Sequence, residues 1–139
     1  MTIYYKIERC VDLDSMKWDY EQYVIAYNVE QPDGRIVRTD AFKGCDGDMV
    51  PLVYRKRGVE YLRPSYLDPD NVIGFVKLEN REEGIFAYYK LFDTVRDKSS
   101  ILAQLDNYTE NVTVHACIYN HNVKEVFDAS IKSVTLRST

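Results

Sequence analysis

Short apolar runs rich in β-branched and aromatic residues recur along most of the chain, separated by polar or turn-forming residues. Runs of this length and composition are typical of β-strands. Strands are therefore expected at Ile3–Ile7, Tyr23–Val29, Met49–Tyr54, Val72–Leu78, Ile85–Phe92, Val112–Tyr119, Val123–Phe127 and Ser130–Arg137. The polar stretch Asn80–Gly84 joins two of these runs and ends in glycine, which predicts a β-hairpin.

One segment has a helical signature instead. Polar residues at Asp97–Ser100 precede the apolar residues Ile101, Leu102 and Leu105, which is the arrangement of a helix N-terminus followed by a buried face. We expect a helix from about Asp97 to Asn107 that packs on the sheet through these three apolar side chains.

Many short strands with one helix indicate a mainly β (α+β) fold, as a small closed or nearly closed antiparallel sheet. The 139 residues are an ordinary length for one domain, so residues 1–139 are expected to form a single unit.

Charge and composition exclude several classes of protein. The net charge of −4 predicts no general affinity for nucleic acid. The sequence contains no apolar run long enough for a membrane span and no signal-peptide pattern at its start. Three cysteines, Cys10, Cys45 and Cys117, cannot all pair within one chain, and we expect free thiols in a reducing compartment.

Three stretches together resemble one protein family. They are Thr39–Arg57, Asp70–Thr94 and Val112–Leu136, which contain DAFKGCDG, VPLVY, LENREEG and CIYN. In this order and spacing they resemble the prohead maturation proteases of HK97-type tailed phages, a branch of the assemblin-like serine proteases that process capsid precursors. The resemblance implies a small β-barrel with helices packed on its outside.

The resemblance also shows replacements at the family's catalytic positions. Lys56 stands where the family has its histidine base, Cys117 where it has its serine nucleophile, and Ser133 where it has an acidic residue. An ordinary lysine stays protonated far above neutral pH, and a cysteine must become a thiolate before it can attack. These changes predict a protein without the protease reaction and without a cofactor.

An active alternative remains open at this stage. His115 and Cys117 are two residues apart on one expected strand, so their side chains share a face and could form a cysteine-type protease site. Without the family's base, a structural role for Cys117 is favoured. The run Arg55-Lys56-Arg57 is interpreted as three solvated cations rather than as a catalytic lysine. His115, Cys117 and His121 lack a fourth ligand, so no metal site is expected.

The expected function is therefore that of a non-catalytic structural or assembly protein of a phage, associated with the capsid as a decoration, minor capsid or connector-region component. Its partners would be capsid or other particle proteins, in multiple symmetric copies, with no nucleic acid and no membrane, in the virion or the host cytoplasm. Alternatives are an active cysteine-type prohead protease and a host-directed inhibitor or adaptor.

A partner-binding segment is expected at Val59–Leu67, which is longer than the family's usual link. It combines aromatic, aliphatic and arginine side chains, the types that anchor protein interfaces. The candidate binding residues are Tyr61, Leu62, Arg63, Tyr66 and Leu67. The alternative is that these residues only cover the open end of the barrel.

Overall fold

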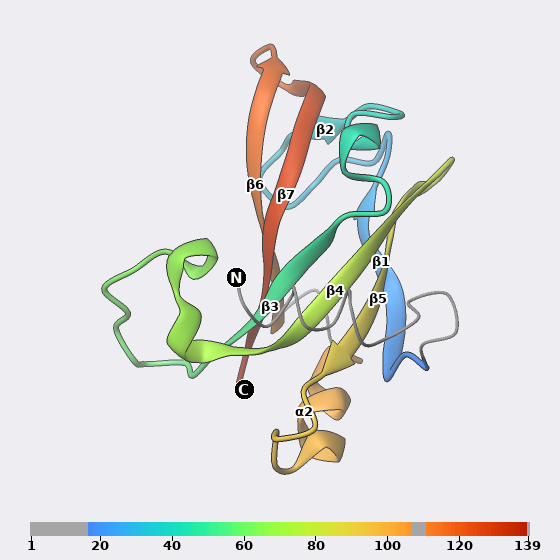
Figure 1. The fold of residues 1–139 in the computed structure, drawn as a ribbon. Coiled ribbons are helices and arrows are strands. Elements are labelled where there is room, and N and C mark those ends of the chain that lie inside the picture. The colour runs from blue at the N-terminus through green and yellow to red at the C-terminus, as the bar shows by residue number, and fades with distance from the viewer. Residues whose placement is uncertain (1–16, 107–110, 139) are drawn as a thin grey trace.

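The computed structural model describes residues 17–106 and 111–138, and the strand expected at Ile3–Ile7 lies outside them. Figure 1 shows the described elements, which are mainly strands. The strands are β1 (Tyr20–Ala26), β2 (Ile36–Val37), β3 (Met49–Arg55), β4 (Val72–Arg81), β5 (Gly84–Leu91), β6 (Val112–His121) and β7 (Glu125–Arg137). The helices are α2 (Lys98–Leu105) and the short 3-10 turns η2 (Lys43–Cys45), η3 (Ser65–Leu67) and η4 (Pro69–Asn71).

All seven strands belong to one sheet, which curls into a half-barrel (Figure 1). The neighbours run β1-β5-β4-β3-β7, and β7 also borders β2 and β6. The mainly β architecture with one α-helix confirms the coarse expectation. The sheet is not closed, because within the described part of the chain β1 and β6 each pair with a strand on one side only.

The expectation of an entirely antiparallel sheet is wrong for two pairs. The hairpins β4/β5 and β6/β7 are antiparallel. The pairs β3/β4 and β1/β5, which longer stretches of chain connect, are antiparallel too. Strand β7, however, runs parallel to β3 and to the short strand β2. A tight turn forces antiparallel pairing, whereas strands far apart in the chain are free of that constraint. Local sequence patterns could not reveal these two orientations.

Strand β7 is a single strand where the sequence suggested two. It spans 13 residues and joins the runs expected at Val123–Phe127 and Ser130–Arg137. Ser133 pairs with His115 of β6, and Ile131 pairs with the next residue, Ala116. Lys132 between them is therefore an extra residue in β7. One extra residue on one strand of a pair is a β-bulge, and it reverses which side chains face inward.

The bulge decides which residues of β7 enter the core. Ala129 and Ile131 face the core before the bulge, and Val134 and Leu136 face it afterwards. Ser133 therefore points to the opposite side of the sheet, which we call the outer face. Ser133 is nevertheless fully buried, so another part of the chain must cover it there.

The expected helix and its packing are confirmed. Helix α2 buries Ile101 and Leu105 and half-buries Leu102 against the core of the half-barrel. Its N-cap residue Asp97 takes a left-handed conformation and makes no side-chain capping bond. The expected strand Tyr23–Val29 is shifted, because β1 ends at Ala26 and Asn28 has a positive φ of 60°.

Gly74 of β4 pairs with Leu91 of β5, where the two strands leave no room for a side chain. A Cβ atom built at this position would lie 2.1 Å from the main-chain oxygen of Lys90, far inside van der Waals contact. Main-chain atoms of a central sheet cannot move away at low cost, so only glycine fits here.

We predict that Gly74→Ala lowers the free energy of unfolding by about 2–3 kcal/mol, because β4 or β5 must shift to relieve the contact. Gly44→Ala is the matched control, since no heavy atom lies within 4 Å of a Cβ built there. Urea unfolding of the two variants measures the difference. Equal stability of both variants would contradict the close approach of β4 and β5.

Candidate functional site

Lys56, the counterpart of the family's base, lies directly after β3 and away from the other replaced positions. Arg55 pairs with Arg137 in the parallel β3/β7 ladder, so Lys56 sits at the level of Ser138. A strand rises about 3.3 Å per residue, so Ser133 lies about 16 Å from Ser138 along β7. Ser130, which pairs with Cys117, lies about 26 Å from Ser138. The structure therefore does not bring Lys56 together with Ser133 or Cys117.

Cys117 and His115 lie on the outer face of β6, as their spacing predicted. The residues that alternate with them, Val114, Ala116 and Ile118, pack against the core. Cys117 pairs with Ser130 across the ladder, and His115 pairs with Ser133. The imidazole of His115 stacks on the ring of Tyr66, with 4.3 Å between ring centroids and 24° between planes. The ring thus faces a tyrosine from the β3–β4 connection.

Ser133, the counterpart of the family's acidic residue, is held under the same connection. Its Oγ lies 3.2 Å from the Oγ of Ser65, within hydrogen-bond distance. Turn η3 contacts both β3 and β7, and turn η4 contacts β3, so this connection covers the outer face at the level of Ser133. Among the described residues, Ser133 and His115 are therefore both engaged by consecutive residues of one segment, Ser65 and Tyr66.

A buried ion pair anchors this segment to the sheet. The Arg55 side chain at the end of β3 donates to Asp68 Oδ2 over 3.2 Å, and the two side chains are only 10% and 8% exposed. Arg55 also donates to the main-chain oxygen of Arg63 and lies over the ring of Tyr61, 4.6 Å from its centroid. Asn71 donates to the same carboxylate oxygen of Asp68 over 2.8 Å.

These contacts correct one interpretation of the sequence. Arg55 is not one of three solvated cations, because it is buried and bonded to Asp68. Lys56 is exposed, as expected. Arg57 is exposed too, but its guanidinium reaches Asn111 Oδ1 at 3.3 Å. A buried arginine on a strand cannot be recognised from its two basic neighbours.

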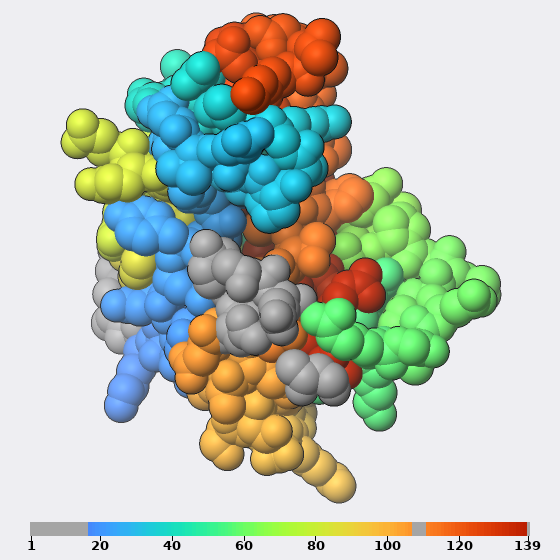
Figure 2. Space-filling model, turned by 180° about the vertical axis from the view of Figure 1, so that it is seen from behind, coloured from blue at the N-terminus to red at the C-terminus, as the bar shows by residue number. Residues whose placement is uncertain are grey.

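The candidate binding residues of Val59–Leu67 divide into two groups. Tyr61 is half-buried, with its ring under Arg55 and its hydroxyl accepting a hydrogen bond from the Lys56 main-chain nitrogen at 2.8 Å. Leu62 is fully exposed, and Tyr66 and Leu67 are 42% and 55% exposed. Arg63 is exposed as well. The segment protrudes beside the sheet in both overall views (Figures 1 and 2).

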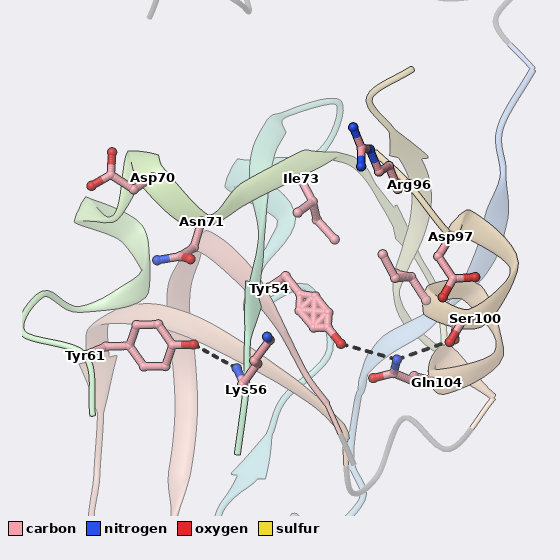
Figure 3. A pocket seen from close by; sticks show the side chains of 11 residues that line it. Tyr54, Lys56, Tyr61, Asp70, Asn71, Ile73, Arg96, Asp97, Ser100 and Gln104 are labelled. Carbon is pink, nitrogen blue, oxygen red and sulfur yellow. Dashed lines mark hydrogen bonds between the residues drawn. The ribbon is translucent and has the colours of Figure 1, made fainter. Parts of the chain in front are cut away.

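An open cavity of about 540 Å³ with a mixed polar and apolar lining lies between the end of β3 and the start of α2 (Figure 3). Lys56 and Tyr61 line one side, and Arg96, Asp97 and Ser100 line the other. Among its lining residues, the Nε2 of Gln104 donates to the Tyr54 hydroxyl over 3.4 Å. The buried Oε1 of Gln104 has no hydrogen-bond partner among the residues that the structure describes. The sequence carried no motif that could have indicated this cavity, whose lining residues are scattered along the chain.

The remaining described cysteine and histidine residues, Cys45 and His121, do not form a reactive or metal-binding site. Within residues 17–106 and 111–138, no group of three His, Cys, Asp or Glu side chains is placed to hold a metal ion. Cys45 is buried and its thiol donates to the Phe42 main-chain oxygen over 3.0 Å, and burial raises the pKa of this thiol. His121 is exposed at the end of β6. No described helix has the length and apolarity needed to cross a bilayer.

Comparison of the chain with protein-family models, with curated proteins and with solved structures finds no match. The resemblance to prohead proteases stays a prediction from the sequence.

We predict that Asp68→Ala lowers the free energy of unfolding by about 3 kcal/mol, because it leaves Arg55 buried without its anionic partner. The control is Asp70→Ala, two residues away, because Asp70 is exposed and should change stability by less than about 0.5 kcal/mol. Chemical unfolding of both variants measures the difference. A loss below about 1 kcal/mol for Asp68→Ala would contradict the anchoring role of the pair.

Proposed function

We propose that this protein is a non-catalytic structural or assembly component of a phage particle, which docks on a particle protein through Val59–Leu67. The observation that carries the proposal is the combination of a firmly anchored segment with exposed apolar side chains. Anchoring lowers the conformational entropy lost on docking, so more of the contact energy is available as affinity. We call Val59–Leu67 the docking segment.

The side chains of the docking segment support a protein partner. Leu62 and Leu67 are more than half exposed although the segment is held in place by Arg55 and Asp68. Burying one exposed leucine on a partner contributes about 1.5–3 kcal/mol. Val59 and Tyr66 add further exposed apolar area, and Arg63 adds a cation of the type enriched at interfaces.

The alternative that these residues only cover the sheet accounts for part of the segment. Tyr61 and Ser65 contact the body of the domain, and Tyr66 does so with one face of its ring. Leu62 is fully exposed and Leu67 more than half exposed, so neither is needed as a cover. The docking proposal is therefore confined to Leu62, Arg63, Leu67 and the exposed part of Tyr66.

The separation of the replaced positions supports a non-catalytic role. A nucleophile needs a base within hydrogen-bond reach, about 2.6–3.2 Å, and Lys56 is far from Cys117. His115 is the nearer candidate base, but its ring stacks on Tyr66 and the structure gives it no hydrogen bond to Cys117. The assignment to a phage particle rests on the three resembling stretches, and the parallel β3/β7 and β2/β7 pairs add nothing to it.

We predict that the double change Leu62→Ser and Leu67→Ser leaves the domain folded but lowers its copy number in purified particles at least tenfold. Both side chains are exposed, so their replacement removes contacts to a partner rather than contacts within the domain. The control is Val123→Ser, which removes an apolar side chain as exposed as Leu62 from the turn between β6 and β7. Quantitative mass spectrometry of particles from the phage that carries the gene measures the copy number.

Two outcomes would contradict the proposal. Full copy number after the double change would place the contact outside the docking segment. Absence of the unmodified protein from the particles would contradict the proposal that it is a structural component of the particle. Processing of the capsid precursor that stops on Cys117→Ala would instead favour the cysteine protease.

A further inference from the structure

We propose that two copies of this chain pair through the free edges of their β6 strands and form a two-fold symmetric dimer with a continuous sheet. This inference does not depend on the function proposed above, because it concerns a different edge of the domain.

The free edge is the side of β6 on which none of the described strands pairs with its main-chain groups. Strand β6 spans ten residues and forms its ladder with β7 on one side. In the part of the chain that the structure describes, no strand pairs with the other side of β6. Figure 1 shows β6 at the margin of the sheet. An edge strand of this kind presents unpaired N–H and C=O groups that match another strand.

Nothing in the sequence of β6 guards this edge. Folded proteins usually protect edge strands with charged side chains, proline or short length. Val112–His121 contains no Asp, Glu, Lys, Arg or Pro, whereas each of the other strands longer than two residues carries at least one charged residue. The opposite edge strand, β1, is shorter, carries Glu21 and has a bulge between Tyr23 and Ile25.

The side chains of β6 also indicate a missing neighbour. Its inward residues Val114, Ala116 and Ile118 pack against the core but remain only half-buried. On the next strand, the inward residues Ile131 and Val134 are 3% and 0% exposed. Another strand beside β6 would cover the inner row to a similar degree. Each half-buried apolar side chain therefore favours strand addition at this edge.

Charge permits a second copy as the occupant, and two-fold symmetry favours it. The chain carries a net charge of −4, so two copies repel one another unless the facing surfaces are free of like charges. The β6 edge meets this condition along its whole length. A two-fold axis also sets each strand antiparallel to its copy, so the same row of donors and acceptors serves both partners.

The alternation of β6 fixes the register. Thr113, His115 and Cys117 face outward, and the residues between them face inward. Opposed residues of an antiparallel pair point to the same face. Full overlap of the regular run Val112–Ile118, which ends at the bulge after Ile118, then puts His115 on the axis. This register sets Thr113 of one copy opposite Cys117 of the other.

The first test is the mass in solution, measured by light scattering over a range of concentrations. The unmodified chain should be a dimer at tens of micromolar. Thr113→Lys with Cys117→Lys places like charges across the axis and should weaken dimerisation at least tenfold. Ser99→Lys with Ala103→Lys changes the charge equally on exposed positions of α2 and should leave the dimer intact. A monomeric unmodified chain, or a lysine variant that still dimerises with unchanged affinity, would overturn the proposal.

The second test does not depend on how well the lysine variant folds. In a Cys10→Ser background, Thr113→Cys should form an intermolecular disulfide with Cys117 of the second copy under mild oxidation. Cys45 is fully buried and does not compete. The crosslinked dimer should disappear when Cys117→Ser is added. No crosslink, or one that persists after Cys117→Ser, would reject this edge and register. Dimer formation only after mixing with an unrelated extended peptide would assign the edge to another partner and would equally overturn the proposal.

Discussion

The outer face of the half-barrel depends on the buried ion pair between Arg55 and Asp68. A guanidinium and a carboxylate that are about nine-tenths buried are tolerable only while each satisfies the other. Arg55 ends β3 and Asp68 lies 13 residues later, so the pair closes a loop onto the strand from which it starts. Closure brings Ser65 against Ser133 and Tyr66 against His115. The loop thereby covers the outer face, with the two short 3-10 turns η3 and η4 as its regular structure.

The bulge at Lys132 is the second constraint, because it turns the Ser133 side chain to the outer face, where the loop buries it. Without an extra residue in β7, the alternation of Ala129 and Ile131 would continue and Ser133 would face the core. With it, Val134 and Leu136 fill the core and Ser133 lies on the outer face, where its hydroxyl meets Ser65. The inserted residue thus lets the Ser133 hydroxyl be buried against the Ser65 hydroxyl. The packing of Val134 and Leu136 in the core is kept.

Sequence analysis predicted what depends on neighbouring residues and missed what depends on distant ones. The β4–β5 hairpin, helix α2 and the shared face of His115 and Cys117 each follow from local spacing. The parallel pairing of β3 with β7 joins residues about eighty positions apart, and that register alone decides that Lys56 is remote from Cys117. The burial of Arg55 was missed for the same reason, since its partner Asp68 is identified only by the folded loop.

The central claim is that the anchored segment permanently covers the outer face at Ser133, and thiol accessibility tests it most directly. Ser133→Cys in a chain that also carries Cys10→Ser and Cys117→Ser places a thiol under Ser65 and Tyr66. The account predicts labelling by a thiol reagent at least a hundredfold slower than for an exposed cysteine, with the protection lost when Asp68→Ala is added. Rapid labelling while Asp68 is intact would show that the segment does not stay on the sheet and would contradict the account.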